Sequence, residues 1–217
     1  MIEATKSRSY LAVLMALVLT AVVAATAQAG SGGLASGGTD SARKSGTAGR
    51  CAEARFGERK LRLGDCGQDV KTLHWILKSR AEGSGVRTRP MFIRRTASAV
   101  RRFQRNAGIK RSGVVNASTR KALVTRMGKS VATWYGPGFW GNRTACGQTL
   151  KKKTVGVAHK KLPCGTKVTI GYRGRFVRTR VIDRGPYAHG ASWDLTQAAA
   201  RKIRMQSTST VRAAVIR

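Results

Sequence analysis

The sequence predicts an α+β chain in which a small helical domain precedes a small closed β-barrel. In the first half, apolar residues recur every three or four positions, as at Val70, Leu73 and Leu77, which is the period of an amphipathic helix. In the second half they alternate with polar residues, as at Val168 and Ile170, which is the period of a strand. A length of 217 residues allows one or two such domains and excludes a large multidomain enzyme.

The net charge of the chain limits the classes of partner that it is expected to attract. Lys and Arg number 42 against 9 Asp and Glu, so the formal net charge at pH 7 is +33. This charge predicts attraction to polyanions, among them nucleic acid, an anionic membrane surface and an acidic cell-wall polymer. Charge alone does not choose among these three.

Residues 1–29 have the pattern of a cleaved secretory signal. Lys6 and Arg8 precede an apolar run over residues 11–25, which ends in the small-residue pattern Ala27-Gln28-Ala29. The alternative is a retained membrane anchor, but the run is shorter than the roughly 20 residues that a spanning helix needs. We therefore expect a secreted, extracellular protein with no stable membrane anchor after signal cleavage.

A flexible linker and two folded regions are expected after the signal. Residues 30–50 consist mostly of Gly, Ser, Ala and Thr, which bury too little apolar surface to offset the entropy of ordering them. The helical domain is then expected over residues 51–126. The barrel domain is expected over residues 131–217, with one helix packed on it near Leu195 and Ala199.

Four cysteines in an exported chain favour disulfides, which help small domains with thin cores. Their spacing favours two local pairs, Cys51 with Cys66 and Cys146 with Cys164. A zinc site is the alternative, but the chain has no Cys-x-x-Cys pair and its histidines show no ligand spacing to the cysteines. We expect neither a metal nor a cofactor.

The helical region contains three segments that resemble a known family. The segments LRLGDCGQDVKTLHWIL, TASAVRRFQRNAGI and SGVVNASTRKAL within residues 51–126 are similar to the peptidoglycan-binding domain type 1 family. The resemblance implies a three-helix module that holds a glycan or stem peptide in a shallow groove. Gln104 is a candidate ligand contact, with plain solvation as the alternative. The region carries 19 Lys and Arg against 5 acidic residues, so anionic wall polymers are further candidate partners.

The barrel region is poor in acidic side chains. Asp183 and Asp194 are its two carboxylates, among 17 Lys and Arg. Cleavage of a glycosidic bond needs a carboxylic acid to protonate the leaving oxygen, and a second group to complete the displacement. Asp183, Asp194 and His159 are therefore the candidate catalytic residues.

Five short motifs give this region a second resemblance. The motifs are ATWYG at 132–136, TACG at 144–147, VAHKKLPCGT at 157–166, VIDRGPY at 181–187 and WDLT at 193–196. With these motifs the region is similar to the rare lipoprotein A double-psi β-barrel family, which is related in fold to expansins. Together the two resemblances imply a protein that is associated with the cell wall. The resemblance implies a six-stranded double-psi barrel that acts on peptidoglycan glycan strands as a lytic transglycosylase. Its expansin relatives imply an alternative, nonhydrolytic wall loosening.

The same resemblance implies roles for the candidate residues. Asp183 matches the family's acid/base, His159 its supporting histidine, and Asp194 the aspartate that expansins require. Asp183 would protonate the glycosidic oxygen and then deprotonate the muramyl C6 hydroxyl, which gives a 1,6-anhydro product. Arg184 beside Asp183 favours its ionised form, so the two carboxylates could share a proton, or Asp183 could be the base and His159 the acid. Structural roles are the alternative, in which Asp183 accepts backbone hydrogen bonds in a turn and Asp194 caps a helix.

Aromatic residues concentrate in the motif loops and are candidates for stacking on sugar rings. The candidate substrate-binding residues here are Trp134, Tyr135, Trp140, Tyr187 and the cationic Arg184. The alternative is that the tryptophans close the ends of the barrel. A nucleic-acid partner is supported by charge alone, and the signal segment, the cysteines and the lack of a base-reading motif count against it.

Overall fold

The structure is a computed structural model that describes residues 51, 53–188 and 190–216, all within one compact unit. The predicted signal at 1–29 and the linker at 30–50 lie outside the described residues. None of the described helices is long and apolar enough to cross a membrane.

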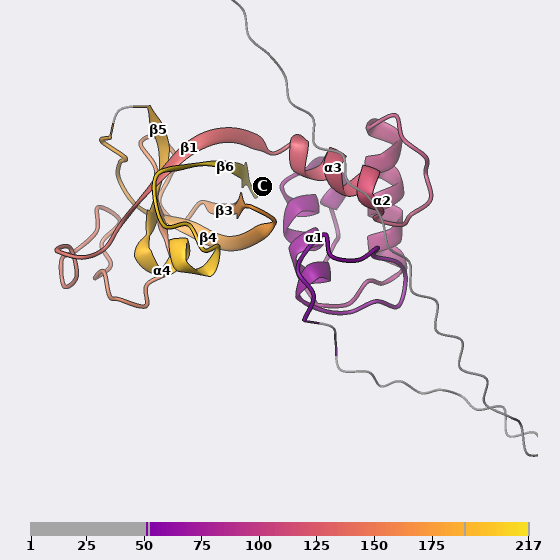
Figure 1. The fold of residues 1–217 in the computed structure, drawn as a ribbon, viewed down its shortest axis with the longest axis horizontal. Coiled ribbons are helices and arrows are strands. Elements are labelled where there is room, and N and C mark those ends of the chain that lie inside the picture. The colour runs from indigo at the N-terminus through magenta and orange to yellow at the C-terminus, as the bar shows by residue number, and fades with distance from the viewer. Residues whose placement is uncertain (1–50, 52, 189, 217) are drawn as a thin grey trace, which may run out of the picture. The chain divides into compact units, whose positions relative to one another are not determined.

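The first folded part is helical, as predicted. Between residues 53 and 127 the described chain forms three α-helices and a short 3-10 helix, which Figure 1 shows in indigo to magenta. Their bounds are α1 Gln68–Lys78, η1 Ala81–Gly83, α2 Arg94–Asn106 and α3 Ala117–Thr125. The side chain of Asn116 caps α3 by accepting a hydrogen bond from the backbone of Thr119 at 2.9 Å.

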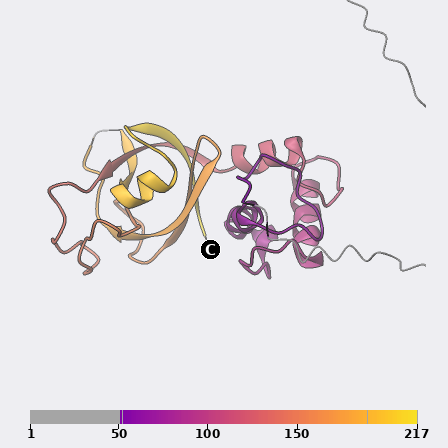
Figure 2. The ribbon, with the colours of Figure 1, turned by 60° about the horizontal axis from the view of Figure 1, so that its bottom comes forward.

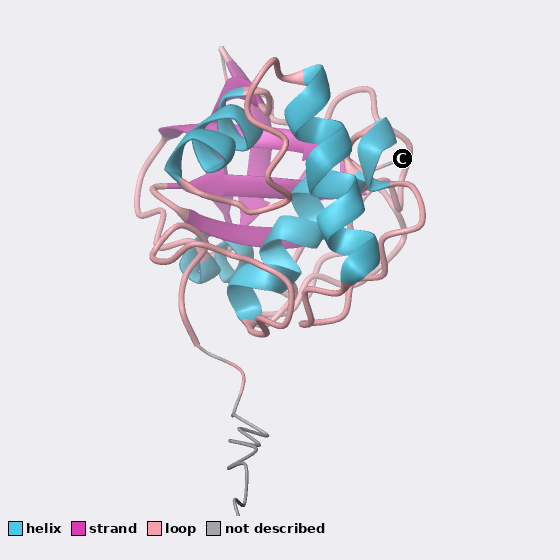
Figure 3. Ribbon diagram, turned by 90° about the vertical axis from the view of Figure 1, so that its right-hand side faces the viewer, coloured by secondary structure: helices cyan, strands magenta, loops and turns pink. Residues whose placement is uncertain are grey.

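The regularly spaced apolar residues of these helices form one core. Val70, Leu73 and Leu77 of α1 are fully buried, as are Val100 and Phe103 of α2. Figure 3 shows these helices in cyan and the barrel strands in magenta. Helix spacing thus predicted the inward face correctly, and burial of this face stabilises helices that are too short to persist alone.

The second folded part is the predicted six-stranded barrel. Its strands are β1 Gly128–Tyr135, β2 Val157–Ala158, β3 Lys167–Tyr172, β4 Arg175–Asp183, β5 Ala191–Thr196 and β6 Ser209–Val215. They close in the order β1-β5-β2-β4-β3-β6. β1 pairs with β5 and β2 pairs with β4 in parallel, while the other neighbours are antiparallel. Val168, Ile170, Val177 and Val181 point into the barrel core, as their alternation predicted.

A single described helix, α4 Gln197–Lys202, packs against the barrel and is the yellow helix in Figure 2. Where the helix contacts the barrel, it buries Ala199, Ala200 and Ile203. The predicted helix included Leu195, which is wrong because Leu195 lies on β5. The turn into α4 comes at Thr196, whose hydroxyl accepts a hydrogen bond from the backbone of Ala199 at 3.3 Å.

Both predicted disulfides are present, Cys51–Cys66 and Cys146–Cys164. The alternative zinc site is therefore wrong, because all four sulfurs are bonded to one another. The first bond ties the start of the helical part to Cys66, two residues before α1 begins at Gln68. The second bond joins a long barrel loop to the segment before β3.

Candidate functional site

The register of the barrel brings the two barrel carboxylates to one place. The short strand β2 lies between β4 and β5, and its residue Ala158 pairs with Asp183 on one side and with Asp194 on the other. Neighbouring strands lie about 4.8 Å apart, so the two aspartates flank Ala158 within about 10 Å of each other. Both carboxylates and Ala158 line one pocket of about 240 Å³.

Asp183 is held by backbone donors at the end of β4. Its Oδ1 atom accepts hydrogen bonds from the backbone N–H of Ala145 at 2.8 Å and from that of Arg184 at 2.9 Å. The turn role considered for Asp183 is thus present. Oδ2 makes no hydrogen bond within the described part of the chain, so this oxygen stays available to a ligand in the pocket.

Asp194 is partly buried on the other side of Ala158. Its Oδ1 atom accepts a hydrogen bond of 2.7 Å from the hydroxyl of Thr133 on β1, its partner in the parallel register. Burial raises the pKa of Asp194 above its ordinary value, and the negative charge of Asp183 adds to the rise, while the Thr133 hydrogen bond acts in the opposite direction. The helix-cap alternative for Asp194 is wrong, because Thr196 caps α4.

Tyr135 is two residues beyond Thr133 on β1 and lines the same pocket. Its hydroxyl oxygen is buried and has no hydrogen-bond partner of normal geometry among the described residues. Burial raises the pKa of this phenol, and the charges of Asp183 and Asp194 raise it further. A neutral O–H group without a partner therefore lies close to both carboxylates.

His159 follows β2 but is not among the residues that line this pocket. Its Nδ1 atom accepts hydrogen bonds from the backbone N–H groups of Lys161 at 3.1 Å and Leu162 at 3.0 Å, and its ring lies 4.6 Å from that of Trp193. Burial lowers the pKa of His159, and the charge of Arg184 lowers it further. A neutral imidazole favours a supporting role over proton donation.

The other predicted site residues divide between the pocket and the protein interior. Tyr187, which is 85% exposed, and Arg184 line the pocket with Tyr135. Trp134 does not line it; its indole N–H donates to the carbonyl of Gln206 at 3.0 Å, and its ring packs on the barrel core. The alternative reading of Trp134 as a packing residue fits this environment.

Two further candidates lie away from the carboxylates. Trp140 is outside the pocket lining, and the Lys152 ammonium lies over its ring at 5.0 Å. Gln104 is fully buried in the helical part, where its side chain bonds to the turn that contains Gly113 and to Thr119. The amide of Gln104 therefore has no surface to offer a ligand directly.

A long loop between β1 and β2 completes the pocket. It contributes Phe139, Asn142 and Arg143 as well as the Ala145 N–H group. Sequence reasoning did not single out Thr133, Asn142, Arg143 or the backbone of Ala145. Of these, only Thr133 could have been found from the sequence, because it lies on the same face of the strand as Tyr135.

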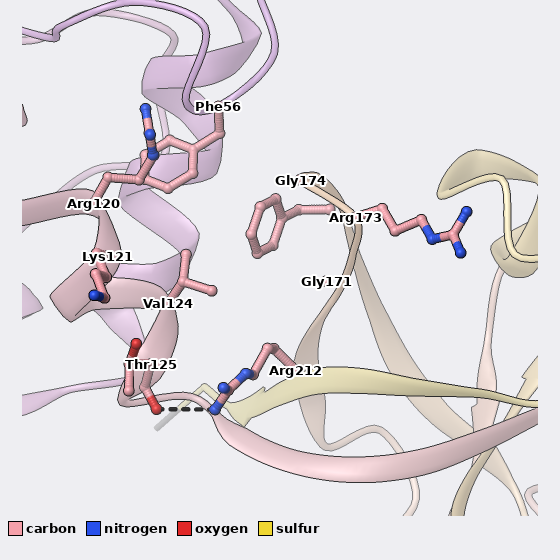
Figure 4. A pocket seen from close by; sticks show the side chains of 10 residues that line it. Phe56, Arg120, Lys121, Val124, Thr125, Gly171, Arg173, Gly174 and Arg212 are labelled. Atoms are coloured by element: carbon pink, nitrogen blue, oxygen red, sulfur yellow. Dashed lines mark hydrogen bonds between the residues drawn. The ribbon is translucent and has the colours of Figure 1, made fainter. Parts of the chain in front are cut away.

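A second cavity lacks the carboxylates of this pocket. Figure 4 shows a cavity of about 290 Å³ where Phe56 and Val124 of the helical part face the β3–β4 turn at Gly174, and its lining contains no carboxylate and no histidine. Arg212 beside it donates to the carbonyls of Thr125 and Met127 at 3.1 Å. Within the described residues, no three His, Cys, Asp or Glu side chains gather closely enough to hold a metal ion.

Two family models match the chain. Residues 128–215 match the model described as "Lytic transglycolase", and residues 66–123 match the model described as "Putative peptidoglycan binding domain". The first range contains all six barrel strands, and the second contains α1, α2 and most of α3.

Curated relatives match somewhat less than half of the chain. The "Probable endolytic peptidoglycan transglycosylase RlpA" of Synechocystis is 42% identical over 96 residues, which is 43% of this chain and 30% of that protein. The "Endolytic peptidoglycan transglycosylase RlpA" of Campylobacter jejuni is 39% identical over 101 residues, or 44% of this chain and 37% of that protein. The chain thus spans about a third of the length of these relatives.

Solved structures resemble the chain more distantly. An expansin of Clavibacter michiganensis matches 41% of this chain and 50% of its own at 22% identity and a TM-score of 0.35. A Streptomyces papain inhibitor matches 41% of this chain and 97% of its own at 24% identity and a TM-score of 0.31.

Proposed function

We propose, from a lytic transglycolase domain at residues 128–215 and a peptidoglycan-binding domain at residues 66–123, that this chain binds peptidoglycan and cleaves its glycan strands as a lytic transglycosylase. One observation carries the proposal, the pairing of Asp183 and Asp194 on either side of Ala158 at a pocket with exposed aromatic side chains. Export and association with the wall belong to the same proposal.

The environments of the two carboxylates give them different roles. Asp194, whose pKa is raised, carries the proton and donates it to the oxygen of the bond between N-acetylmuramic acid and N-acetylglucosamine. That bond to the muramyl C1 breaks, and the muramyl C6 oxygen bonds to C1. Asp183 accepts the proton that leaves the C6 hydroxyl. The products are a 1,6-anhydromuramyl end and a free N-acetylglucosamine hydroxyl.

The remaining residues support this proton exchange. The proton taken by Asp183 must return to Asp194 before the next turnover. We assign this transfer to the Tyr135 hydroxyl, whose pKa is raised by the charges of both aspartates. His159 supports the end of β4, since its backbone N–H donates to the Asp183 carbonyl at 3.2 Å. The exposed ring of Tyr187 and the cationic Arg184 hold the sugar and its carboxylate.

The test is a digest of purified peptidoglycan with the full chain, followed by mass spectrometry of the released fragments. The wild type is expected to release fragments with 1,6-anhydromuramyl ends, and Asp183→Asn to slow the release by about 100-fold or more. Asp65→Asn is the matched control, since it makes the same change at a carboxylate outside the pocket and should leave the rate unchanged.

Two outcomes would overturn the proposal. Fragments with ordinary reducing ends would mean hydrolysis by water. A protein that sediments with the wall but creates no new glycan ends would instead be a nonhydrolytic wall-loosening protein of the expansin type.

A further inference from the structure

We infer that a basic groove on the outer face of the barrel binds a phosphodiester-linked polyol chain, the teichoic type of cell-wall polymer. The groove has a volume of about 450 Å³. It lies between outward side chains of β4 and the end of the long loop that joins β1 to β2. The inference rests on the proposed association with the wall for its choice of ligand.

The cations of the groove come from two strands that lie side by side (Figure 1). Arg178 and Arg180 are two residues apart on β4, so they are separated by about 7 Å along the strand. They alternate with Val177 and Val181, which point into the barrel core, and the arginines therefore point outward. Lys167 of β3 lies directly opposite Arg180, where side chains start about 5 Å apart. Three positive charges are thus within reach of one short segment of a polyanion.

These three charges have no protein partner. Every ion pair among the described residues lies in the helical part, and the lining of the groove contains no carboxylate. The described chain also offers no hydrogen-bond acceptor to the side chains of Lys167, Arg178 and Arg180. Like charges directly opposite each other on neighbouring strands destabilise a sheet. A bound polyanion offsets this repulsion, so the groove is complementary to one.

The loop wall of the groove is held by hydrogen bonds. The Thr179 hydroxyl on β4 donates to the Val155 carbonyl at 3.1 Å and ties the end of the loop to the strand. The Thr154 hydroxyl accepts from the Lys151 N–H at 2.9 Å, and the Thr154 N–H donates to the Lys151 carbonyl at 2.9 Å. The turn closed by these two bonds carries exposed lysines at 151–153. The loop wall is therefore arranged before the ligand binds, which lowers the entropy cost of binding.

The chemistry of the lining favours a phosphodiester chain over other anions. Arginine guanidinium groups bind phosphate oxygens through two parallel hydrogen bonds, and the exposed Gln148 adds an amide donor. The lining has no aromatic side chain on which nucleic-acid bases could stack. Ile182 is only 7% exposed, so little of its apolar surface is left for the side chains of an acidic peptide. A polyol phosphate chain carries regular charges without bases or apolar side chains, and it fits this lining best.

The groove and the carboxylate pocket are on opposite sides of the end of β4. Ile182 lines the groove, and the next residue, Asp183, lines the pocket. Successive side chains of a strand point to opposite faces of a sheet. A polymer in the groove therefore leaves the pocket free for a glycan strand.

The experiment compares two triple variants of the full chain that lose the same charge. K167Q/R178Q/R180Q removes the cations of the groove. R201Q/K202Q/R204Q removes three exposed cations at the end of α4, which lie outside the groove and whose side chains make no hydrogen bond among the described residues. The probes are soluble poly(glycerol phosphate), polyglutamate and single-stranded DNA, matched in total charge. Equilibrium binding is measured at about 0.15 M salt, where exposed charges attract only within about 8 Å.

The groove variant is expected to bind poly(glycerol phosphate) about tenfold more weakly than the control variant. R178K/R180K keeps the charge but removes the guanidinium groups, so it should also weaken this binding. Three outcomes would overturn the inference: equal weakening by both triple variants, unchanged binding by R178K/R180K, or an equally large loss of polyglutamate or DNA binding in the groove variant.

Polymer binding is measured apart from cleavage, because the soluble polymer contains no glycan strand. If the wild type cleaves no peptidoglycan while the groove variant still loses polymer binding, the proposed activity fails and the inference stands. If the wild type cleaves peptidoglycan but binds the polymer no better than the groove variant does, the inference fails and the activity stands. Circular dichroism of each variant identifies any loss of binding that follows from unfolding.

Discussion

Replacing Cys146 and Cys164 by alanine removes the bond that holds the long loop of the barrel near its carboxylates. Ala145, the residue before Cys146, donates its backbone N–H to Asp183 at 2.8 Å. Without the disulfide, the loop is tied to the barrel by weaker contacts. We expect the variant to lose both stability and activity.

The expected loss of stability follows from the length of the loop that the disulfide closes, and the expected loss of activity follows from one hydrogen bond. The bond closes a separation of 18 residues, and its removal is expected to lower the free energy of unfolding by about 3 kcal/mol. Loosening a hydrogen bond to a charged group costs about 1.5–3 kcal/mol, which corresponds to a roughly 10- to 100-fold slower cleavage if that bond orients Asp183 in the reaction.

The helical part offers a matched control. The Cys51–Cys66 bond closes 15 residues, so its removal should also cost about 3 kcal/mol, but it lies outside the carboxylate pocket. Urea denaturation measures stability, and the rate of release of anhydro-ended fragments measures activity. The reasoning is refuted if the barrel variant retains the wild-type rate, or if both disulfide variants slow cleavage equally.

Three further predictions concern single side chains. Burial lowers the pKa of His74 to about 4, so below about pH 6.5 this histidine binds a proton in the unfolded chain but not in the folded one. The free energy of unfolding should therefore fall by up to about 3 kcal/mol between pH 6.5 and 4. His74→Gln should remove this pH dependence in urea titrations. Thr133→Val removes a hydrogen bond that lowers the pKa of Asp194, so the alkaline limb of the pH-rate profile should move to higher pH, and an unchanged limb would exclude Asp194 as the acid. Tyr135→Phe should reduce the cleavage rate by about tenfold or more with little change in wall binding, whereas equal losses of both would indicate a purely structural role.

The sequence predicted the elements and the fold well because side-chain periodicity reports burial directly. Val168 and Ile170 alternate as a strand requires, and both point into the barrel. Leu195 was misassigned because its spacing to the alanines that follow fits a helix. The hydroxyl of Thr196, which begins that helix, determines where the strand ends.

The site was predictable to the extent that it depends on rare side chains. Asp183 and Asp194 are conspicuous as the two acids of a basic domain, yet their proximity depends on β2, which is two residues long and gives no periodic signal. The Ala145 donor is a backbone group, which residue type cannot reveal. Gln104 was expected as a surface contact because sequence gives the amide but not the buried turn that uses it.

The central claim is that Asp194, beside the charge of Asp183, holds the proton that is donated to the glycosidic oxygen. The chain has five aspartates, so ¹³C labelling of aspartate carboxyl groups gives few enough signals to follow each through a pH titration by NMR. The account predicts that Asp194 titrates above its ordinary pKa of 3.8 and that Asp183→Asn lowers this value. An Asp194 that titrates in its ordinary range, or one that is unaffected by Asp183→Asn, would contradict the account.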